Sequence, residues 1–364
     1  MTARYVVPKV QGRGAGLGNE LFVWGKAFIA AQLLSYKALH PAWGLNKRGY
    51  RRYFRTPQYD WLIHKALVEA FPSIEVTESD YRSAGCDFSK SIIALDQTWA
   101  LSKRKVFALS VSGMWGGFHA IEPAREFLRG QLLNTRSTMG NLFRLETAFP
   151  KDNVRVGVHV RRGDFSVLQQ GDNYQSKFNV AIPLEWYKTV ISKINKSFSG
   201  RVTFFISTDA PIEEIKSIFE GCQFIDSSHL PMNDISDLLA LSQCDLTICS
   251  VSSYSLWAAF FSTGRYIWFE PNLFDHGSCA SIWGNEFNQQ ISCSPTWSAL
   301  HQVSSLLEGG FSLSPRGVPV DFDGNVPKDI FDYLETCFSR RRRETDLIRY
   351  GVVPVSADKN SRKN

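Results

Sequence analysis

The pattern of apolar and polar positions becomes regular from about residue 150 onward. Short apolar runs of the kind found in buried strands lie at 154–160, 202–207, 222–225, 246–249 and 266–269. Segments with helical spacing of apolar residues or helix-start signals lie at 183–195, 209–220, 234–242, 253–262 and 329–338. Strands that alternate with helices in this way are typical of a doubly wound parallel sheet, so the pattern predicts an α/β fold.

The first 150 residues are less regular, but they open on a clear unit: a short strand, a glycine-rich loop at 12–19 and a buried helix at 20–36. A dinucleotide-binding loop has this order, with an acidic residue about 20 positions later for the ribose. The next acidic residue after Glu20 is Asp60, so NAD binding is disfavoured, and a tight turn that permits close helix packing is the alternative. The pattern divides the chain into two domains and a C-terminal extension with a helix and a basic tail, at 1–150, 151–300 and 301–364.

Composition and charge narrow the class of ligand. The 364 residues carry a formal net charge of +6, which suits an anionic small molecule or a membrane surface and is too small to indicate nucleic acid. The seven cysteines form no C-x-x-C pair and have no metal-ligand spacing, so we expect reduced thiols in a cytoplasmic protein. No apolar run reaches the roughly 20 clean residues of a membrane span, so we expect no transmembrane anchor.

Two basic clusters stand out, at 47–55 and at 340–343. The first is interleaved with aromatic residues, which favours a solvated loop with aromatic anchors; a surface for a sugar, a diphosphate or anionic lipid is the alternative. The second is typical of a solvated helix end, and peripheral contact with an anionic inner membrane is its alternative.

Three polar motifs each follow a predicted strand of the second domain, namely H-V-R-R-G-D at 159–164, S-T-D at 207–209 and S-V-S-S-Y-S at 250–255. In a parallel sheet all three lie at one edge, so they can share a ligand. Adjacent arginines and the start of a helix both favour phosphate. The structural alternatives are helix capping by Asp209, Ser252 and Ser253, and a salt bridge between Arg161 and Asp164.

These residues also carry a family resemblance. The block at 159–164 matches the H-x-R-R-x-D motif of α1,2- and α1,6-fucosyltransferases and protein O-fucosyltransferases, and the chain most resembles the α1,2-fucosyltransferases, glycosyltransferase family 11. Three further blocks follow that family's order: G-L-G-N-E-L-F at 16–22 resembles G-G-L-G-N-Q-M-F, D-L-L-A-L-S-Q-C at 237–244 resembles D-L-x-L-M-S-x-C, and S-S-Y-S-L-W-A-A at 252–259 resembles S-S-F-S-W-W-G-A.

The resemblance implies a GT-B fold, in which two Rossmann-like domains face a central cleft and the C-terminal one holds GDP. It implies transfer of L-fucose from GDP-β-L-fucose with inversion, and no required cofactor or metal. The expected acceptor is a hydroxyl, O2 of a galactoside, on a bacterial-type surface glycan or oligosaccharide.

The resemblance also implies roles for particular residues. Arg161 would neutralise the β-phosphate, while Arg162 would bind the donor or pair with Asp164 to fix the loop. His159 and Asp209 would read the guanine end. The remaining donor contacts would come from Ser252, Ser253, Ser255, Gly16 and Gly18.

Asn19 would face the reacting centre from the first domain. The base that takes the acceptor proton stays open among Asp164, Glu20 and a phosphate-assisted path.

Departures from the family pattern concern the acceptor more than the donor. Glu20 stands where the family has Gln, Leu256 stands where it has Trp, and residues 41–150 show no match. Two other functions therefore remain: a transferase for a different GDP-sugar such as GDP-mannose, and a non-catalytic protein that binds a membrane surface.

Overall fold

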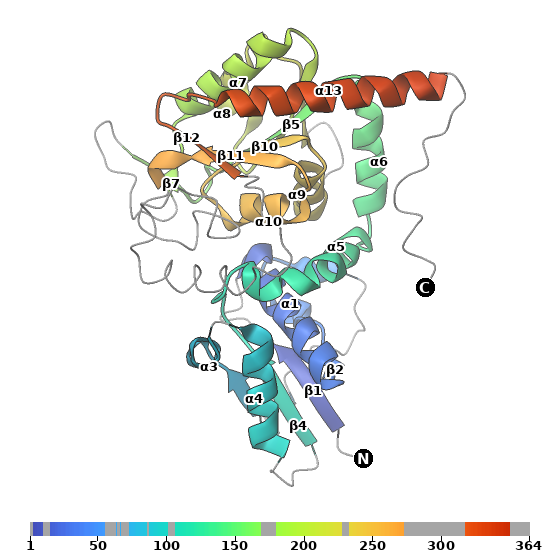
Figure 1. Cartoon of the computed structure of the whole chain (residues 1–364), viewed down its shortest axis with the longest axis vertical. Coiled ribbons are helices and arrows are strands. Elements are labelled where there is room, and N and C mark those ends of the chain that lie inside the picture. Colours follow the sequence, from blue (N-terminus) through green and yellow to red (C-terminus); the bar gives the residue numbers. More distant parts are fainter. Residues whose placement is uncertain are drawn as a thin grey trace.

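The structure is a computed structural model of the full chain. It describes residues 3–9, 15–54, 63, 66, 73–85, 87–100, 106–168, 180–227, 233–272 and 317–349. Two parallel sheets lie one above the other along the long axis, each with helices packed against it (Figure 1). The predicted α/β fold class, with two domains that each contain a parallel sheet, is confirmed.

The first sheet has the order β2-β1-β4-β3, and all its neighbouring strands are parallel. Its strands are β1 (Ala3–Pro8), β2 (Lys37–Ala38), β3 (Ser73–Val76) and β4 (Val106–Val111). The helices of this half are α1 (Leu17–Leu34), α3 (Glu78–Ser83), α4 (Phe88–Ala100), α5 (Arg125–Leu133) and α6 (Thr138–Ala148), with short 3-10 turns η1 (Trp43–Leu45), η2 (Tyr50–Arg52) and η3 (His119–Ala124).

The second sheet has the order β12-β11-β10-β5-β8-β9 and is also parallel throughout. Its strands are β5 (Val154–Val160), β8 (Val202–Thr208), β9 (Phe224–Asp226), β10 (Leu246–Ile248), β11 (Arg265–Phe269) and β12 (Gly317–Val320). Its helices are α7 (Leu184–Phe198), α8 (Ile212–Ile215), α9 (Asp234–Ser242), α10 (Ser253–Phe261) and α13 (Lys328–Arg349), with 3-10 turns η4 (Lys216–Phe219) and η6 (Glu270–Asn272), and a small β6 (Ser166–Val167) pairs with β7 (Val180–Ala181).

The predicted elements of the second domain match this sheet closely, because each is specified by its own apolar pattern. Every residue of β5 is buried, as expected for a central parallel strand. The predicted helix at 209–220 differs. It is a four-residue α8 followed by a 3-10 turn, and its N-cap is Pro211 rather than Asp209.

The C-terminal segment is not a separate extension, which corrects the division at residue 301. β12 adds a strand to the second sheet beside β11. Ile330 and Leu334 of α13 are fully buried in the same core. Arg340 and Arg341 are ion-paired with the buried Asp245, at 3.4 and 2.9 Å, so these two members of the predicted basic run are bound within the domain. The tail after residue 349 lies outside the described residues.

The two domains share a hydrophobic core where α1 meets α10 (Figure 1). Phe22 of α1 and Phe118 both pack on Trp257 of α10, with ring centroids 4.8 and 4.9 Å apart. Arg125 of α5 donates hydrogen bonds to the last carbonyls of α10, including that of Phe260 at 2.7 Å. The aromatic contacts and these hydrogen bonds hold α1 and α5 against α10.

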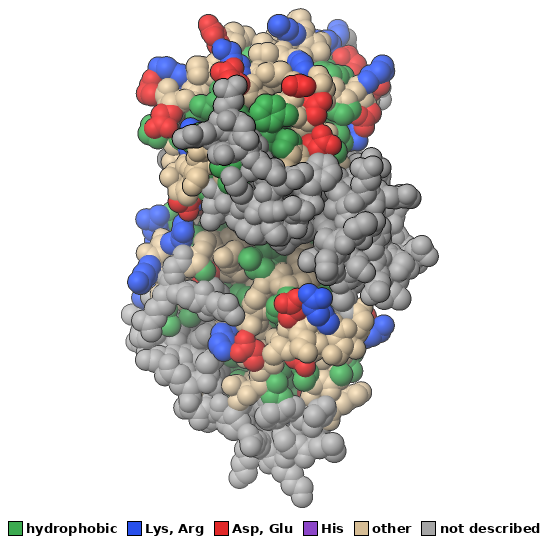
Figure 2. Space-filling model, turned by 90° about the vertical axis from the view of Figure 1, so that its left-hand side faces the viewer, with side chains coloured by type: hydrophobic (Ala, Val, Ile, Leu, Met, Phe, Trp, Pro, Cys, Tyr) green, Lys and Arg blue, Asp and Glu red, His purple; other side chains and the backbone are tan. Residues whose placement is uncertain are grey.

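The described surface opposite α6 carries Lys and Arg interspersed with Asp and Glu over the second domain (Figure 2). Among the helices within the described ranges, none is long and apolar enough to cross a membrane.

Candidate functional site

The three polar motifs meet at the carboxyl edge of the second sheet, as predicted. β5 lies between β8 and β10, and His159 is in register with Ser207. The chain leaves the sheet at Val160, Thr208 and Ile248, which are the last residues of these three neighbouring strands. The loops that follow therefore surround one region.

The first part of this region is the Arg161 loop, residues 161–164. The Arg161 guanidinium pairs with Asp164 at 2.6 Å and with Asp209 at 2.9 Å. The two oxygens of Asp209 also accept the backbone N–H groups of Arg162 and Gly163, at 2.8 and 3.0 Å. Asp209 thus anchors the loop instead of capping α8, whose N-cap is Pro211.

The two arginines differ from the expected split. Asp164 pairs with Arg161 and not with Arg162, so the loop-fixing ion pair belongs to the first arginine. Among the described residues, the half-buried side chain of Arg162 has no carboxylate within ion-pair distance. Arg161 is a fixed, compensated cation, and Arg162 is a cation without an acidic partner there.

His159 belongs to a buried cluster beneath the loop. Its Nδ1 lies 2.6 Å from Ser255 Oγ and 2.8 Å from Ser250 Oγ, and Ser255 Oγ accepts the Ser250 N–H at 3.0 Å. Burial, with a smaller effect from the nearby charge of Arg161, lowers the pKa of His159 to about 3, so the ring is neutral. The cluster ties the end of β5 to the start of α10, and it places His159 and Ser255 inside the protein rather than on the ligand surface.

The glycine loop meets the start of α10. A β-carbon on Gly18 would lie 3.0 Å from Trp257 Cδ1 and 3.1 Å from Ser253 Oγ, and Trp257 Nε1 donates to the Gly18 carbonyl at 3.0 Å. Close packing thus explains Gly18, whereas Gly16 has open space around it. Ser252 caps α10 by accepting the Tyr254 N–H, at 3.2 Å.

Asn19 follows Gly18 in the first turn of α1, so it lies at this junction of two helix N-termini. Those first turns contain N–H groups without intrahelical partners, which favours an anion there. Residues 12–14 of the glycine loop lie outside the described part of the chain.

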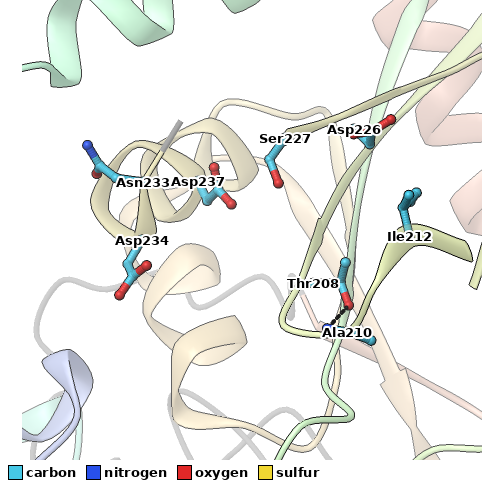
Figure 3. A pocket seen from close by; sticks show the side chains of 8 residues that line it. All are labelled: Thr208, Ala210, Ile212, Asp226, Ser227, Asn233, Asp234 and Asp237. Carbon is cyan, nitrogen blue, oxygen red and sulfur yellow. Dashed lines mark hydrogen bonds between the residues drawn. The ribbon is translucent and has the colours of Figure 1, made fainter. Parts of the chain in front are cut away.

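The Asp237 pocket is a second part of the site that the sequence analysis did not single out. It is a hollow of about 210 Å³ at the ends of β8 and β9 and the start of α9, lined by Thr208, Ala210, Ile212, Asp226, Ser227, Asn233, Asp234 and Asp237 (Figure 3). Oδ2 of Asp237 accepts from Ser207 at 3.3 Å. Its Oδ1 is buried and, within the described residues, has no hydrogen-bond partner.

Burial raises the pKa of Asp237 to about 7, against a smaller lowering by serine hydrogen bonds. An unsatisfied buried carboxyl oxygen is costly unless a ligand supplies a donor. The signal in the sequence was an acidic residue in the first turn of a predicted helix, within a block quoted only for its family resemblance.

Glu20 is a second buried carboxyl group, in the first turn of α1. Asn46 Nδ2 donates to it at 2.7 Å, and burial raises its pKa to about 7. Glu20 directly follows Asn19 and changes its charge around neutral pH. The described residues contain no cluster of three or more side chains suited to hold a metal ion.

Comparison with known families gives one match. Residues 103–278, from the segment that holds β4 to just beyond β11, match the family described as glycosyl transferase family 11. The resemblance predicted from the motifs is thereby confirmed. A search of curated proteins finds no match.

Several solved structures are similar at low identity. Fucosyltransferase NodZ from Bradyrhizobium is 14% identical with a TM-score of 0.46, over 74% of this chain and 97% of that chain. POFUT1 in complex with GDP-fucose is 12% identical with a TM-score of 0.40, over 73% and 98%. Heptosyltransferase WaaC of E. coli with ADP-2-deoxy-2-fluoro heptose is 14% identical with a TM-score of 0.36, over 83% and 99%.

Proposed function

We propose that this chain, which carries the glycosyl transferase family 11 sequence over residues 103–278, is a fucosyltransferase that uses GDP-fucose as its donor. The observation that carries the proposal is the arrangement at one sheet edge. A cationic loop after β5, a helix start after β10 and a small pocket with an unsatisfied carboxyl oxygen lie around neighbouring strands.

The Asp237 pocket is our candidate for the guanine. About 210 Å³ is less than the roughly 300 Å³ or more that encloses a whole drug-sized ligand, so it suits a base with the rest of the nucleotide outside. The Watson–Crick edge of guanine presents N–H donors at N1 and N2, and an ionised carboxylate accepts both. Asp237 therefore takes the role that the sequence analysis gave to Asp209.

The diphosphate then extends toward the Arg161 loop and the N-terminus of α10. Arg161 has two of its five N–H groups in ion pairs, which leaves donors in a fixed direction for the β-phosphate. Arg162 adds charge that no described carboxylate neutralises. Ser253 and the first N–H groups of α10 complete the phosphate contacts, while His159 and Ser255 position this helix start from below.

The proposed reaction is a single displacement at C1 of fucose. The acceptor hydroxyl oxygen forms a bond to C1 of fucose as the bond from C1 to the β-phosphate oxygen breaks on the opposite face, so the configuration inverts. Negative charge grows on the leaving GDP, where Arg161 is already oriented, and a pre-oriented donor stabilises that charge without reorganisation. Asn19 faces the reacting sugar from the first domain.

The hydroxyl proton passes to a base, for which Asp164, Glu20 and the leaving phosphate are the candidates. Asp164 is engaged with Arg161. Glu20 has the pKa of about 7 that suits a general base at neutral pH. A pH–rate profile whose ionisation near 7 disappears in Glu20→Gln would assign the base. An unchanged profile would exclude Glu20.

Calorimetric titration with GDP tests the donor site, and a transfer assay tests the activity. We expect saturable GDP binding that persists in EDTA, transfer from GDP-fucose and little transfer from GDP-mannose. An acceptor panel that includes lactose and Gal-β1,3-GalNAc, with the linkage read by NMR, identifies the acceptor and tests for O2 of galactose. An absence of GDP binding by the intact protein contradicts the proposal.

A further inference from the structure

The outer surface at the start of α6 combines exposed apolar side chains with arginines. Met139 and Phe143 lie one helical turn apart and are 61% and 74% exposed. Beside them is a hollow of about 530 Å³, lined by Leu133, Asn134, Thr135, Arg136, Ser137, Met139, Gly140, Asn141 and Arg144. We call Arg136, Met139, Phe143 and Arg144 the α6 surface.

Its charge has one sign. Within the described residues, neither Arg136 nor Arg144 has a carboxylate at ion-pair distance, and the one acidic residue of α6, Glu146, is bound to Arg155 at the other end of the helix. The Arg136 N–H donates to the Tyr53 carbonyl at 3.1 Å, which brings the backbone of the 47–55 cluster next to this surface. The opposite face of the second domain, by contrast, mixes both signs of charge (Figure 2).

The N-terminus of α6 opens into the same hollow. Its N-cap, Ser137, makes no side-chain capping bond, so N–H groups of the first turn remain for an anion. The two arginines can hold phosphate oxygens, and Met139 and Phe143 are suited to enter the boundary between headgroups and acyl chains. An anionic bilayer presents both chemistries in one plane.

We infer that the α6 surface docks this protein on an anionic phospholipid bilayer, with headgroup phosphates on Arg136 and Arg144 and the side chains of Met139 and Phe143 in the interface. This inference goes beyond the proposed function and does not require it. In the basic run at 340–343, for which membrane contact was the alternative, Arg340 and Arg341 are ion-paired with Asp245.

The surface is connected to the donor site. Asn141 on the inner side of α6 is 1% exposed and donates to Ser236 Oγ of α9 at 2.8 Å. The same α9 carries Asp237, so the docking helix packs directly on the helix that lines the proposed guanine pocket.

Sedimentation of the full chain with vesicles tests the inference. The vesicles are an equal mixture of phosphatidylglycerol and phosphatidylcholine, or phosphatidylcholine alone, at about 0.1 M and about 0.5 M salt. We expect binding to the mixed vesicles that weakens at the higher salt. Each basic side chain near an anionic surface contributes about a fivefold factor, so Arg136→Gln with Arg144→Gln should lower the partition coefficient about 25-fold. Met139→Ser with Phe143→Ser should lower it about tenfold or more.

The matched control is Lys188→Gln with Lys196→Gln, which removes the same charge from α7 and should change binding less than twofold. GDP binding by calorimetry should stay unchanged in all three double variants, which separates this inference from the proposed function. Equal binding to both kinds of vesicle overturns the inference. So do α6 variants that bind like the parent protein, and a loss in the control as large as theirs.

Discussion

The Arg161 loop and the Asp237 pocket are adjacent parts of one sheet edge, but their carboxylates differ in how many hydrogen-bond donors the protein supplies to them. Asp209 accepts two backbone N–H groups and the Arg161 guanidinium. Asp237 has a weak bond from Ser207 to one oxygen and a buried second oxygen that no described group satisfies. Asp209 therefore has donors from the protein for both oxygens, whereas Asp237 needs a donor from a ligand for Oδ1.

This difference separates a carboxylate that organises the site from one that recognises the ligand. A carboxylate whose acceptor positions are occupied fixes the direction of Arg161 before any substrate arrives, which is what electrostatic preorganisation requires. A buried carboxyl oxygen without a donor favours whichever ligand offers one. Asp209 and Asp237 both lie at the carboxyl edge of the sheet. Their hydrogen-bond partners therefore distinguish the organising role from the recognition role.

The largest effect on activity is expected in the Arg161 loop. Arg161→Lys should lower kcat by about 10²–10³-fold, because an ammonium group cannot reproduce the fork that contacts Asp164, Asp209 and the phosphate together. Initial rates with GDP-fucose measure this. Arg201→Lys, at an exposed ion pair with Glu335, is the control and should retain normal rates. Near-normal turnover by Arg161→Lys would show that the loop does not act on the leaving group.

Changes in the Asp237 pocket should affect the affinity for GDP instead. Asp237→Asn should weaken GDP binding about 10- to 100-fold, the range for hydrogen bonds to a charged group, and should reduce the preference for GDP over ADP. Asp234→Asn removes the same charge from an exposed position in the same pocket and should have little effect. Calorimetry with both nucleotides checks this, and equal losses in the two variants would reduce the role of Asp237 to general charge.

Crowding the loop should disturb it through Asp209. A β-carbon on Gly163 would overlap the Asp209 carboxylate, so Gly163→Ala should break the anchor, at a cost of about 1–3 kcal/mol in loop geometry that appears as lower kcat. Gly130→Ala in α5 enters open space and serves as the control. If both variants have parent-like rates, Asp209 does not control the orientation of Arg161.

The smallest effect is a pH dependence of GDP affinity. In the free protein the pKa of Asp237 is raised to about 7, and guanine N–H donors favour the ionised form, so binding below that pH must release a proton. Affinity should therefore rise by up to about tenfold per pH unit as pH approaches 7 from below, and level off above it. Calorimetry in buffers of different ionisation enthalpy counts the proton, and Asp237→Asn should abolish its release.

Stability has the opposite dependence. A raised pKa in the folded state means that the unfolded chain holds fewer protons between about pH 4 and 7. Asp237 and Glu20 thus lower the free energy of unfolding as pH rises through that range. Between about pH 4 and 7, the affinity for GDP should therefore rise with pH while the free energy of unfolding falls.

Much of the fold could be predicted from the sequence because its signals are local. The apolar runs of β5 and β8 and the periodicity of α7 each specify an element without reference to the rest of the chain. β12 could not be predicted in this way, since its four residues form a strand only through pairing with β11. Likewise the helix predicted from Asp209 begins only at Ile212, because that carboxylate bonds the Arg161 loop instead of capping α8.

The site, like the fold, was predictable only where its signals are local. The order of elements along the chain was enough to predict that the ends of β5, β8 and β10 share one edge, because parallel topology follows from that order. It could not determine which carboxylate is satisfied, because Arg162 and Asp209 are 47 positions apart and Gly18 and Trp257 are 239 apart. The three-dimensional arrangement was needed to see that the Asp209 oxygens have donors, that Asp237 Oδ1 has none among the described residues and that Gly18 packs against Trp257. Hydrogen bonds and close packing depend on distances in space, which no local pattern encodes.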